Sequence, residues 1–534
     1  MNKLLRIHPA DNCLVALTNL ASGKYNYDEN RTIEVIDTVP PKHKVALVDL
    51  PKGSVVTQYG VSVGCTLIDV KEGELLTLEN LVHLADPTEI RKTNYSWNKP
   101  NVSHFKARTF MGYQRPDGKV GTANYWLFIP LVFCENRNLK KIEEALNRSL
   151  GYQKENNYTE FAQQVLGQTI SQSKTSTITR PFKNIDGIRY LYHDGGCGGT
   201  RQDAETLLRL LAGYVHHPNV AGATVLSLGC QHAQIDWFKE VQQELYPHSV
   251  KPTIYLEQQE VKSEEQLIKT AISQTIEQLH EANKVTRQPA PLSKLVVGLE
   301  CGGSDGFSGI SANPAVGHVS DMVTALGGST ILSEFPELNG VEQNIVDRCV
   351  NRKLAKKFLT IQETYHQRAK DAGSGFDKNP SPGNIREGLI TDAIKSAGAA
   401  KKGGDSAIVD ILDYTEPVVN QGLNLLCTPG NDVESTTGMA GSGANLILFT
   451  TGLGTPTGNP ITPVIKISSN TKLYQDMPDI IDFNAGEVIS GEKTIQQVGE
   501  ELLYKIIAVA SGEQSKAMLL DQNDFILWKR GVSL

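Results

Sequence analysis

The first 85 residues alternate short apolar runs with polar turns. Runs such as "CLVALTNL", "TIEVIDTVP" and "HKVALVDL" are separated by connectors that carry Pro, Gly, Asn or Asp. Short apolar runs bounded by turn residues are typical of β-strands. The pattern predicts a small all-β domain over residues 1–86, followed by a polar linker without periodicity over residues 87–108.

From residue 109 the pattern changes. Buried-looking strands such as "YWLFIPLVF", "ATVLSLG" and "KLVVGLE" alternate with amphipathic stretches such as "ETLLRLLAGYV". This alternation is typical of βαβ units and mostly parallel sheets. A polar stretch at residues 281–293 predicts a boundary between a middle α/β domain, residues 109–285, and a C-terminal α/β domain, residues 286–534. A chain of 534 residues also exceeds what one hydrophobic core usually supports.

Composition excludes several functional classes. The net charge is -7 and the chain has no dense block of Lys and Arg, which argues against nucleic acid as a partner. Charges interrupt the N-terminal segment too early for a signal peptide, and no apolar run approaches the roughly 18 residues of a membrane span. Eight dispersed cysteines without CxxC spacing argue against disulfides and a zinc ribbon. We therefore expect a cytoplasmic protein.

Five of the cysteines stand at or just after the ends of predicted strands: Cys134, Cys197, Cys230, Cys301 and Cys427. Ligands of open parallel sheets bind outside the carboxyl ends of the strands, so these thiols are candidates for the functional edge. Cysteine also packs there as a small hydrophobe. Both interpretations stay open, and convergence of three of these thiols would make an iron-sulfur cluster a hypothesis.

Three loops rich in glycine and hydroxyl groups follow predicted strands, at residues 192–205, 299–314 and 427–460. Glycine lets the backbone approach a ligand closely, and a following helix N-terminus favours an anion. Buried hydroxyl groups need partners, so such loops suit a polyhydroxylated ligand such as a sugar acid, although tight strand-to-helix turns would give a similar pattern. No GxGxxG or Walker A motif occurs, which removes the main support for a dinucleotide or P-loop site.

Several motifs together resemble those of a known protein family. With "HPADN", "HKVALVDL", "GLECGGSDGFSGISANPAVG", "TPGND" and "TTGLGTPTG", the chain resembles the altronate and galactarate dehydratase family over nearly its whole length. The resemblance implies a SAF-type, β-clip-like N-terminal domain followed by two α/β domains. "GLNLLCTPGND" and "GLECGGSDG" are more similar to the altronate branch, which implies dehydration of D-altronate to 2-dehydro-3-deoxy-D-gluconate with Fe(II), or Mn(II) in its place. The expected partner is a small sugar acid, with no nucleic acid or membrane, and a homo-oligomer is left open.

The resemblance also implies residue roles. The expected metal ligands are His193, Cys197, Cys230, Glu300, Cys301, Asp305 and Asp432. The expected contacts to substrate are Arg201, Ser304, Ser308, Asn313 and Asn431. For proton transfer we expect His8, His43 and His193, because imidazole titrates near neutral pH; solvated surface histidines are the alternative for His8 and His43.

One departure bears on substrate choice. Many members of the family carry Arg in "TTGRGTP" where this chain has Leu453. A second substrate carboxylate, as in galactarate, would then lack one cation unless another residue such as Arg201 supplies it, and burying such a charge without a cation is costly. The alternatives to an altronate dehydratase are a galactarate or related aldarate dehydratase, an iron-sulfur hydro-lyase using three strand-end cysteines, and a non-catalytic sugar-acid sensor.

Overall fold

The structure is a computed structural model that describes residues 3–28, 30–91, 95–153, 157–167 and 179–533. The chain divides into two compact units. Unit 1 comprises Met1–Gly112 and Gln288–Trp528, and unit 2 comprises Tyr113–Arg287 and Lys529–Leu534. Each unit has its own core and is described separately.

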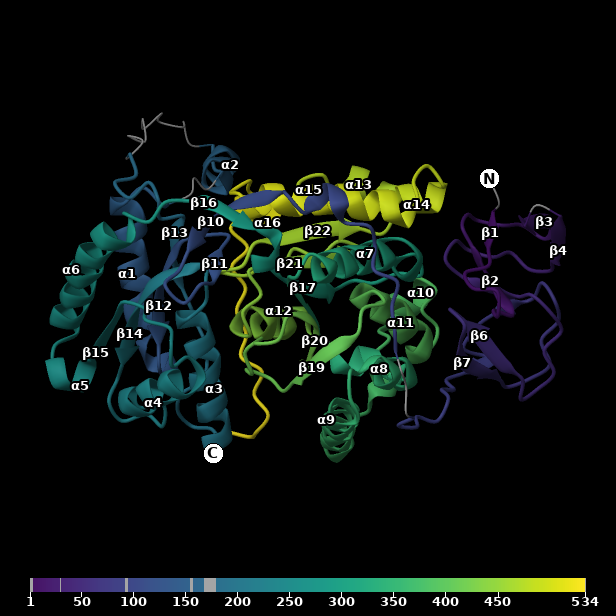
Figure 1. The fold of residues 1–534 in the computed structure, drawn as a ribbon, viewed down its shortest axis with the longest axis horizontal. Helices are drawn as coiled ribbons and strands as arrows, with labels where there is room; N and C mark the ends of the chain where they lie inside the picture. Colours follow the sequence, from purple (N-terminus) through teal and green to yellow (C-terminus); the bar gives the residue numbers. More distant parts are fainter. Residues whose placement is uncertain (1–2, 29, 92–94, 154–156, 168–178, 534) are drawn as a thin grey trace. The chain divides into compact units, whose positions relative to one another are not determined.

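The N-terminal part of unit 1 is built from strands, drawn in purple in Figure 1. Its three antiparallel sheets are β1-β2-β5-β8, β3-β4 and β6-β7-β9. The strands are β1 (Leu4–Leu5), β2 (Cys13–Ala16), β3 (Gly23–Asp28), β4 (Arg31–Val35), β5 (Lys44–Ala46), β6 (Val55–Gln58), β7 (Val61–Thr66), β8 (Leu75–Leu76) and β9 (Leu81–Val82). Apolar side chains from β1, β2, β4 and β5, such as Leu14, Val35 and Val45, form its core.

The C-terminal part of unit 1 is a seven-stranded parallel sheet with the order β19-β20-β18-β17-β21-β22-β23. The strands are β17 (Val296–Cys301), β18 (Ser329–Leu332), β19 (Ile408–Leu412), β20 (Gly422–Leu426), β21 (Leu446–Thr451), β22 (Val464–Ser468) and β23 (Phe483–Asn484). The principal helices are α7 (Ala312–Ala325), α8 (Glu342–Arg348), α9 (Arg352–Asp371), α11 (Asp392–Ala399), α12 (Asp432–Gly441), α13 (Thr471–Asp476) and α15 (Ile495–Ala510). Shorter elements are α10 (Pro382–Arg386), α14 (Glu487–Ser490), α16 (Lys516–Leu519), η4 (Ser308–Ile310), η5 (Phe335–Leu338) and η7 (Ala400–Gly403).

The sequence of this sheet explains its position inside the unit. Strands β18, β20, β21 and β22 are buried at every residue, as expected for parallel strands whose two faces are both covered. Parallel strands bring their carboxyl ends to one edge, so the loops after β17, β18, β20 and β21 gather there. This edge positions the candidate site.

Unit 2 contains a four-stranded parallel sheet, β13-β12-β14-β15. Its strands are β12 (Tyr125–Pro130), β13 (Gly187–Tyr190), β14 (Val220–Ser227) and β15 (Thr253–Glu257), with helices α1 (Asn136–Ser149), α2 (Asn157–Val165), α3 (Arg201–Val215), α4 (Ile235–Leu245), α5 (Gln258–Val261) and α6 (Glu264–Ala282). Trp126 and Phe128 pack with Leu139 and Leu279 of the flanking helices α1 and α6.

These features confirm the predicted fold class, a small all-β domain followed by α/β regions with parallel sheets. The proposed domain boundaries stay predictions, and residues 92–94 of the predicted linker lie outside the described residues. β10 (Thr109–Gln114) pairs through its first four residues with β16 (Gln288–Pro291) and through its last two with β11 (Val120–Gly121). No helix among the described residues combines the length and apolar character needed to cross a membrane.

Candidate active site at the edge of the seven-stranded sheet

Glycines in the loops after β17 and β21 let two acidic side chains approach the backbone. A Cβ atom on Gly302 would lie 2.1 Å from Asp432 Oδ2, at the start of α12. A Cβ atom on Gly452, after β21, would lie 2.2 Å from the Asp305 carboxyl carbon. Neither position has room for a side chain, so the glycines allow the two carboxylates to approach the backbone.

A thiol and two carboxylates converge at this edge. Ligand atoms of Cys301, Glu334 and Glu337 all lie within 4.8 Å of one another, and the three residues are buried. Cys301 ends β17, whereas Glu334 precedes η5 after β18 and Glu337 lies within η5. Glu334 has a left-handed backbone, with φ of 65°, which is uncommon for a residue with a side chain. Such backbone strain is often stored at functional sites.

Two lysines compensate this acidic group. Lys402 of η7 donates from Nζ to Cys301 Sγ and to Glu334 Oε2, both at 2.7 Å. Lys395 of α11 contacts Glu337 Oε1 at 2.6 Å. The ammonium groups are almost completely buried with their partners, so water contributes little screening and removal of either partner would leave a buried charge.

Burial and the neighbouring charges determine the protonation of the group. Burial raises the pKa of the Cys301 thiol, and the carboxylates of Glu334 and Glu337 raise it further. Burial also raises the pKa of Glu300, with a further increase from Glu334. For Glu337 burial acts in the same direction, but the two lysines hold its pKa below the usual value. Glu337 is therefore ionised, whereas Glu300 favours the protonated form.

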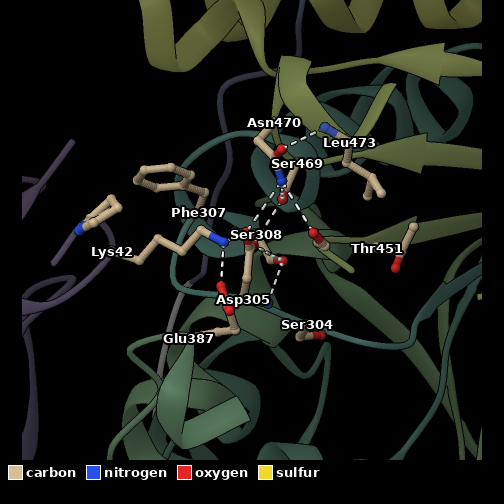
Figure 2. A network of polar contacts seen from close by, with 12 residues as sticks. Lys42, Ser304, Asp305, Phe307, Ser308, Glu387, Thr451, Ser469, Asn470 and Leu473 are labelled. Atoms are coloured by element: carbon tan, nitrogen blue, oxygen red, sulfur yellow. Dashed lines mark hydrogen bonds and ion pairs between the residues drawn. The ribbon is translucent and has the colours of Figure 1, made fainter. Parts of the chain in front are cut away.

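Asp305 forms a second polar network from the same loop. Its Oδ1 accepts hydrogen bonds from Ser308 N at 2.9 Å, Ser308 Oγ at 2.8 Å and Ser469 Oγ at 2.8 Å. Asn470 Nδ2 lies 3.4 Å from Oδ2. The carboxylate is completely buried, and these donors, drawn in Figure 2, stabilise it without contact to water.

Lys42, from the N-terminal part of unit 1, contacts this network. Its Nζ lies 3.0 Å from Asp305 Oδ2 and also contacts Glu387 Oε2. Figure 2 shows the Lys42 side chain extending toward both carboxylates. Burial alone would lower the pKa of Lys42, but Asp305 and Glu387 hold it above the usual value, so the ammonium form persists.

The loop glycines also fix the backbone of this lysine. Lys42 has a left-handed φ of 75°. Cβ atoms on Gly306 and Gly388 would lie 2.7 Å and 2.4 Å from its carbonyl oxygen. The next lysine in the chain, Lys44, is buried and donates from Nζ to the Gly388 carbonyl, and burial lowers its pKa to about 8.

Of the residues predicted from the sequence, Glu300, Cys301 and Asp432 come together at this edge, and Asp305 lies in the adjacent network. Glu300 accepts hydrogen bonds from Ser333 and Ser435. Four further predictions fall on neighbouring loops and helix starts: Ser304, Ser308, Asn313 and Asn431.

These four side chains differ in their contacts. Ser308 binds Asp305, and Asn313 donates to the Gly398 carbonyl. Asn431 accepts hydrogen bonds from Val433 N and Glu434 N, so its oxygen caps α12. Ser304 is buried, with its carbonyl oxygen bonded to Asn384. Whether they bind substrate stays a prediction.

Two further predicted residues, His8 and His43, belong to the N-terminal part of unit 1. His8 is exposed and accepts a hydrogen bond from Ala10 N, and His43 is half-buried with Nδ1 3.2 Å from the Pro41 oxygen. Burial lowers the pKa of His43, which favours the neutral imidazole.

Four predicted residues belong to unit 2: His193, Cys197, Arg201 and Cys230. Arg201 is exposed at the first position of α3. The two cysteines are exposed, whereas His193 is buried. The single ligand set predicted from the sequence is thus divided between the two units.

Sequence reasoning missed Lys42, Glu334, Glu337, Lys395 and Lys402. Glu334 ends the predicted strand "STILSE" and Glu337 follows it, so the rule that led to the strand-end cysteines would also have found them. No local pattern marks the lysines, because their partners are distant in the sequence.

The residues around Cys301 fit a divalent metal ion. A thiolate suits iron or zinc and carboxylates suit harder ions, so a mixed set of this kind accepts Fe(II) or Mn(II). Oε1 of Glu300 and Oε1 of Glu334 are buried and lack a hydrogen-bond donor among the described residues, which leaves lone pairs for a cation. Lys402 already faces two of the donors, so a metal ion would compete with its ammonium group.

Comparisons with known proteins agree with this organisation. Three family profiles match the chain: "Altronate/galactarate dehydratase SAF domain" over residues 2–84, "D-galactarate dehydratase/Altronate hydrolase, second domain" over 112–283, and "D-galactarate/Altronate dehydratase, C-terminal" over 292–533. The altronate dehydratase of Bacillus subtilis (strain 168) is 33% identical over 100% of both chains. That of Escherichia coli (strain K12) is 34% identical over 99% of both. Galactarate dehydratase (L-threo-forming) of Escherichia coli (strain K12) is 29% identical over 96% of this chain and 93% of its own. The chain therefore belongs to the D-galactarate/altronate dehydratase family.

Proposed function

We propose that this protein is a hydro-lyase that dehydrates a sugar acid, with D-altronate as substrate and 2-dehydro-3-deoxy-D-gluconate as product. The support for altronate is the similarity to two altronate dehydratases over essentially the full length of each chain. The observation that carries the chemistry is the convergence of buried carboxylates, a thiol and three lysines at one edge of a parallel sheet.

The reaction requires two proton transfers and control of charge. A base removes the proton at C2, beside a carboxylate that is already negative, and an acid assists loss of the C3 hydroxyl. His43 is our candidate base, because its lowered pKa keeps the imidazole neutral and it adjoins Lys42 in the chain. His8 stays a second candidate.

Lys42 supplies positive charge where the N-terminal strands meet the β17 loop. Its ammonium group persists beside Asp305, so it can attract the substrate carboxylate or donate a proton to the departing hydroxyl. Asp305 fixes that ammonium through an ion pair while Ser308 and Ser469 hold the carboxylate in place. This arrangement provides the preorganisation that acid-base catalysis requires.

We propose that Cys301, Glu334 and Glu337 hold Fe(II), or Mn(II) in its place. When bound, the ion supplies positive charge that stabilises the negative charge developing on the substrate. Lys402 and Lys395 orient its three ligands through the hydrogen bonds and ion pair described above. We propose the cytoplasm as the location, because all eight cysteines are free.

Leu453 supports altronate over galactarate. Its side chain is 40% exposed after β21, where the motif of many members of the family carries Arg. Altronate has one carboxylate and galactarate has two, so galactarate would place a second charge in a site that lacks this cation.

The experiment is a panel assay. The reduced full-length protein is supplied with Fe(II) and incubated with aldonates and aldarates, and formation of 2-keto-3-deoxy acid is followed. We expect kcat/KM for D-altronate to exceed that for galactarate by at least about tenfold, equivalent to about 1.4 kcal/mol. Equal values would contradict the altronate assignment, and stabilisation by altronate without turnover would indicate a sensor.

A further inference from the structure

Three of the eight cysteines are exposed, and none of these three has a part in the proposed reaction. Cys134, Cys197 and Cys230 are free and exposed, whereas the other five are buried or half-buried. Cysteine is among the most frequently buried residue types, and an exposed thiol is open to oxidation. All three lie in unit 2, so their exposure calls for a reason within that unit.

The topology of unit 2 places the three cysteines at one edge. They follow β12, β13 and β14, and β12 is the central of these three strands. Both pairings, β12 with β13 and β12 with β14, are parallel, so the three loops leave the sheet on the same side. Ligands of open parallel sheets bind at this side.

Backbone contacts hold the three loops together. Phe133 N, next to Cys134, donates to the Gly195 oxygen at 3.1 Å. His232 N, two residues after Cys230, donates to the Gly196 oxygen at 3.1 Å. The oxygen of Gly196 belongs to the peptide that joins it to Cys197, so this peptide connects the loops after β13 and β14.

Glycine is required where the loop after β13 approaches the loop after β12. Gly196 has φ of 97°, and a Cβ atom there would lie 2.0 Å from the Leu131 oxygen. Gly198 and Gly229, which flank Cys197 and Cys230, also have positive φ, at 71° and 121°. Residues other than glycine rarely adopt such angles. The backbone conformation beside Cys197 and Cys230 therefore requires glycine.

His193 stabilises this arrangement. Its Nε2 lies 2.7 Å from the Pro130 oxygen, and its Nδ1 accepts a hydrogen bond from Gly195 N at 3.1 Å. Both ring nitrogens therefore have backbone partners, and burial lowers the pKa of the imidazole to about 4. His193 therefore holds the loop after β13 in place.

We propose that Cys134, Cys197 and Cys230 bind an iron-sulfur cluster through their three thiolates. Among the described residues, these sulfurs do not form a group within 4.8 Å of the kind that Cys301 forms with its glutamates. A single ion needs its donors close together, whereas cluster ligands bind different iron atoms and stand farther apart. The proposal rests on three exposed thiols on loops that contact one another at one edge of the sheet.

The surroundings suit an anionic cluster. The loop with Cys197 leads into the N-terminus of α3, a helix of 15 residues whose dipole favours negative charge. Lys529, in the C-terminal segment assigned to unit 2, contacts Asp194 Oδ2 at 2.6 Å and adds a cation beside the loop. Three protein thiolates also leave one iron of a four-iron cluster free to bind oxygen atoms of a small molecule.

This inference goes beyond the proposed function and does not depend on it. The cluster site lies in unit 2, and the Fe(II) site proposed above lies in unit 1. The two differ in one measurable component, because a cluster contains acid-labile sulfide and a single Fe(II) does not.

The experiment measures iron and acid-labile sulfide in full-length protein purified without oxygen, together with its visible absorption and electron paramagnetic resonance after reduction. We expect about four sulfides per chain, as in a [4Fe–4S] cluster. Cys134→Ser, Cys197→Ser and Cys230→Ser should each lower the sulfide content at least about fivefold, since each removes one of three ligands.

Controls separate the cluster from the other cysteines. Cys65→Ser and Cys301→Ser, both in unit 1, should keep the sulfide content of the unaltered protein. Alkylation of Cys197 by iodoacetamide should be at least about tenfold slower with the cluster bound than after its removal, which tests the ligand independently of variant folding. Iron without sulfide, or a Cys197→Ser variant with unchanged sulfide, would overturn the proposal. Absence of altronate turnover by the unaltered protein, supplied with Fe(II) and with its cluster intact, would instead count against the proposed function.

Discussion

Replacing Lys42 by methionine tests whether the N-terminal part of unit 1 contributes a residue to the active site. Methionine keeps most of the aliphatic side chain and removes the ammonium group that lies 3.0 Å from Asp305 Oδ2. Asp305 is completely buried, so water cannot take the place of that cation. The change therefore leaves a buried carboxylate without its ion-pair partner.

The structure sets the size of the effect. Breaking a buried ion pair by removing one partner costs roughly 3–5 kcal/mol. Asp305 keeps its hydrogen bonds from Ser308 and Ser469, and the Lys42 side chain is 15% exposed, which places the cost at the low end. We expect a loss of about 3 kcal/mol in the unfolding free energy of unit 1. Because the same ammonium is proposed to meet the substrate, kcat/KM for altronate should fall on the order of 100-fold.

Thermal unfolding and altronate turnover are measured on Lys42→Met and on Lys71→Met as the matched control. Lys71 Nζ lies 4.0 Å from Asp49 Oδ2, and both side chains are about two-thirds exposed, so this pair is worth about 0–1 kcal/mol. If both variants unfold at the same temperature and turn over altronate at the unaltered rate, the Lys42 contact has no part in the site.

Three further predictions concern other regions. Gly302→Ala should abolish most turnover, because the new Cβ would lie 2.1 Å from Asp432 Oδ2; an unchanged rate would show that the loop can move without consequence. Chelation should remove activity that Fe(II) or Mn(II) restores, and Cys301→Ser should weaken Fe(II) binding at least about tenfold in a titration; unaltered affinity would place the ion elsewhere. Burial lowers the pKa of His216 from 6.5 to about 4, so the folded state loses stability as the pH falls through this window, by about 2 kcal/mol at pH 5. His216→Gln should reduce the difference in Tm between pH 7 and pH 5, and an equal difference would refute that assignment.

Periodicity predicted the sheets well, because parallel strands covered on both faces are apolar throughout. The runs "KLVVGLE", "GLNLLCTP" and "NLILFTTG" contain β17, β20 and β21, and the loops after them carry the glycines that the close approach of Asp432 and Asp305 requires. The rule that ligands bind at the carboxyl ends of strands directed attention to this edge, and its role as the active site stays a prediction.

The other residues of the candidate site depend on long-range contacts that local sequence patterns do not encode. In "PPKHKVAL" the sequence drew attention to His43 and Lys44, whereas the contact to Asp305 comes from Lys42, whose positive φ the sequence does not reveal. Lys402 reaches Cys301 from a segment 101 residues away with no recognisable motif. The sequence also could not divide the predicted ligands between two units, because strand-end cysteines look alike in both sheets.

The most direct test of the account follows the fate of D-altronate in heavy water. The reduced protein supplied with Fe(II) is incubated with D-altronate in D₂O, and the product is examined by proton nuclear magnetic resonance. Removal of the C2 proton and loss of the C3 hydroxyl give an enol that takes one deuteron from solvent at C3. The account predicts 2-dehydro-3-deoxy-D-gluconate with a single deuterium at C3. Unchanged altronate, recovered from a folded protein that binds both Fe(II) and altronate, would contradict it.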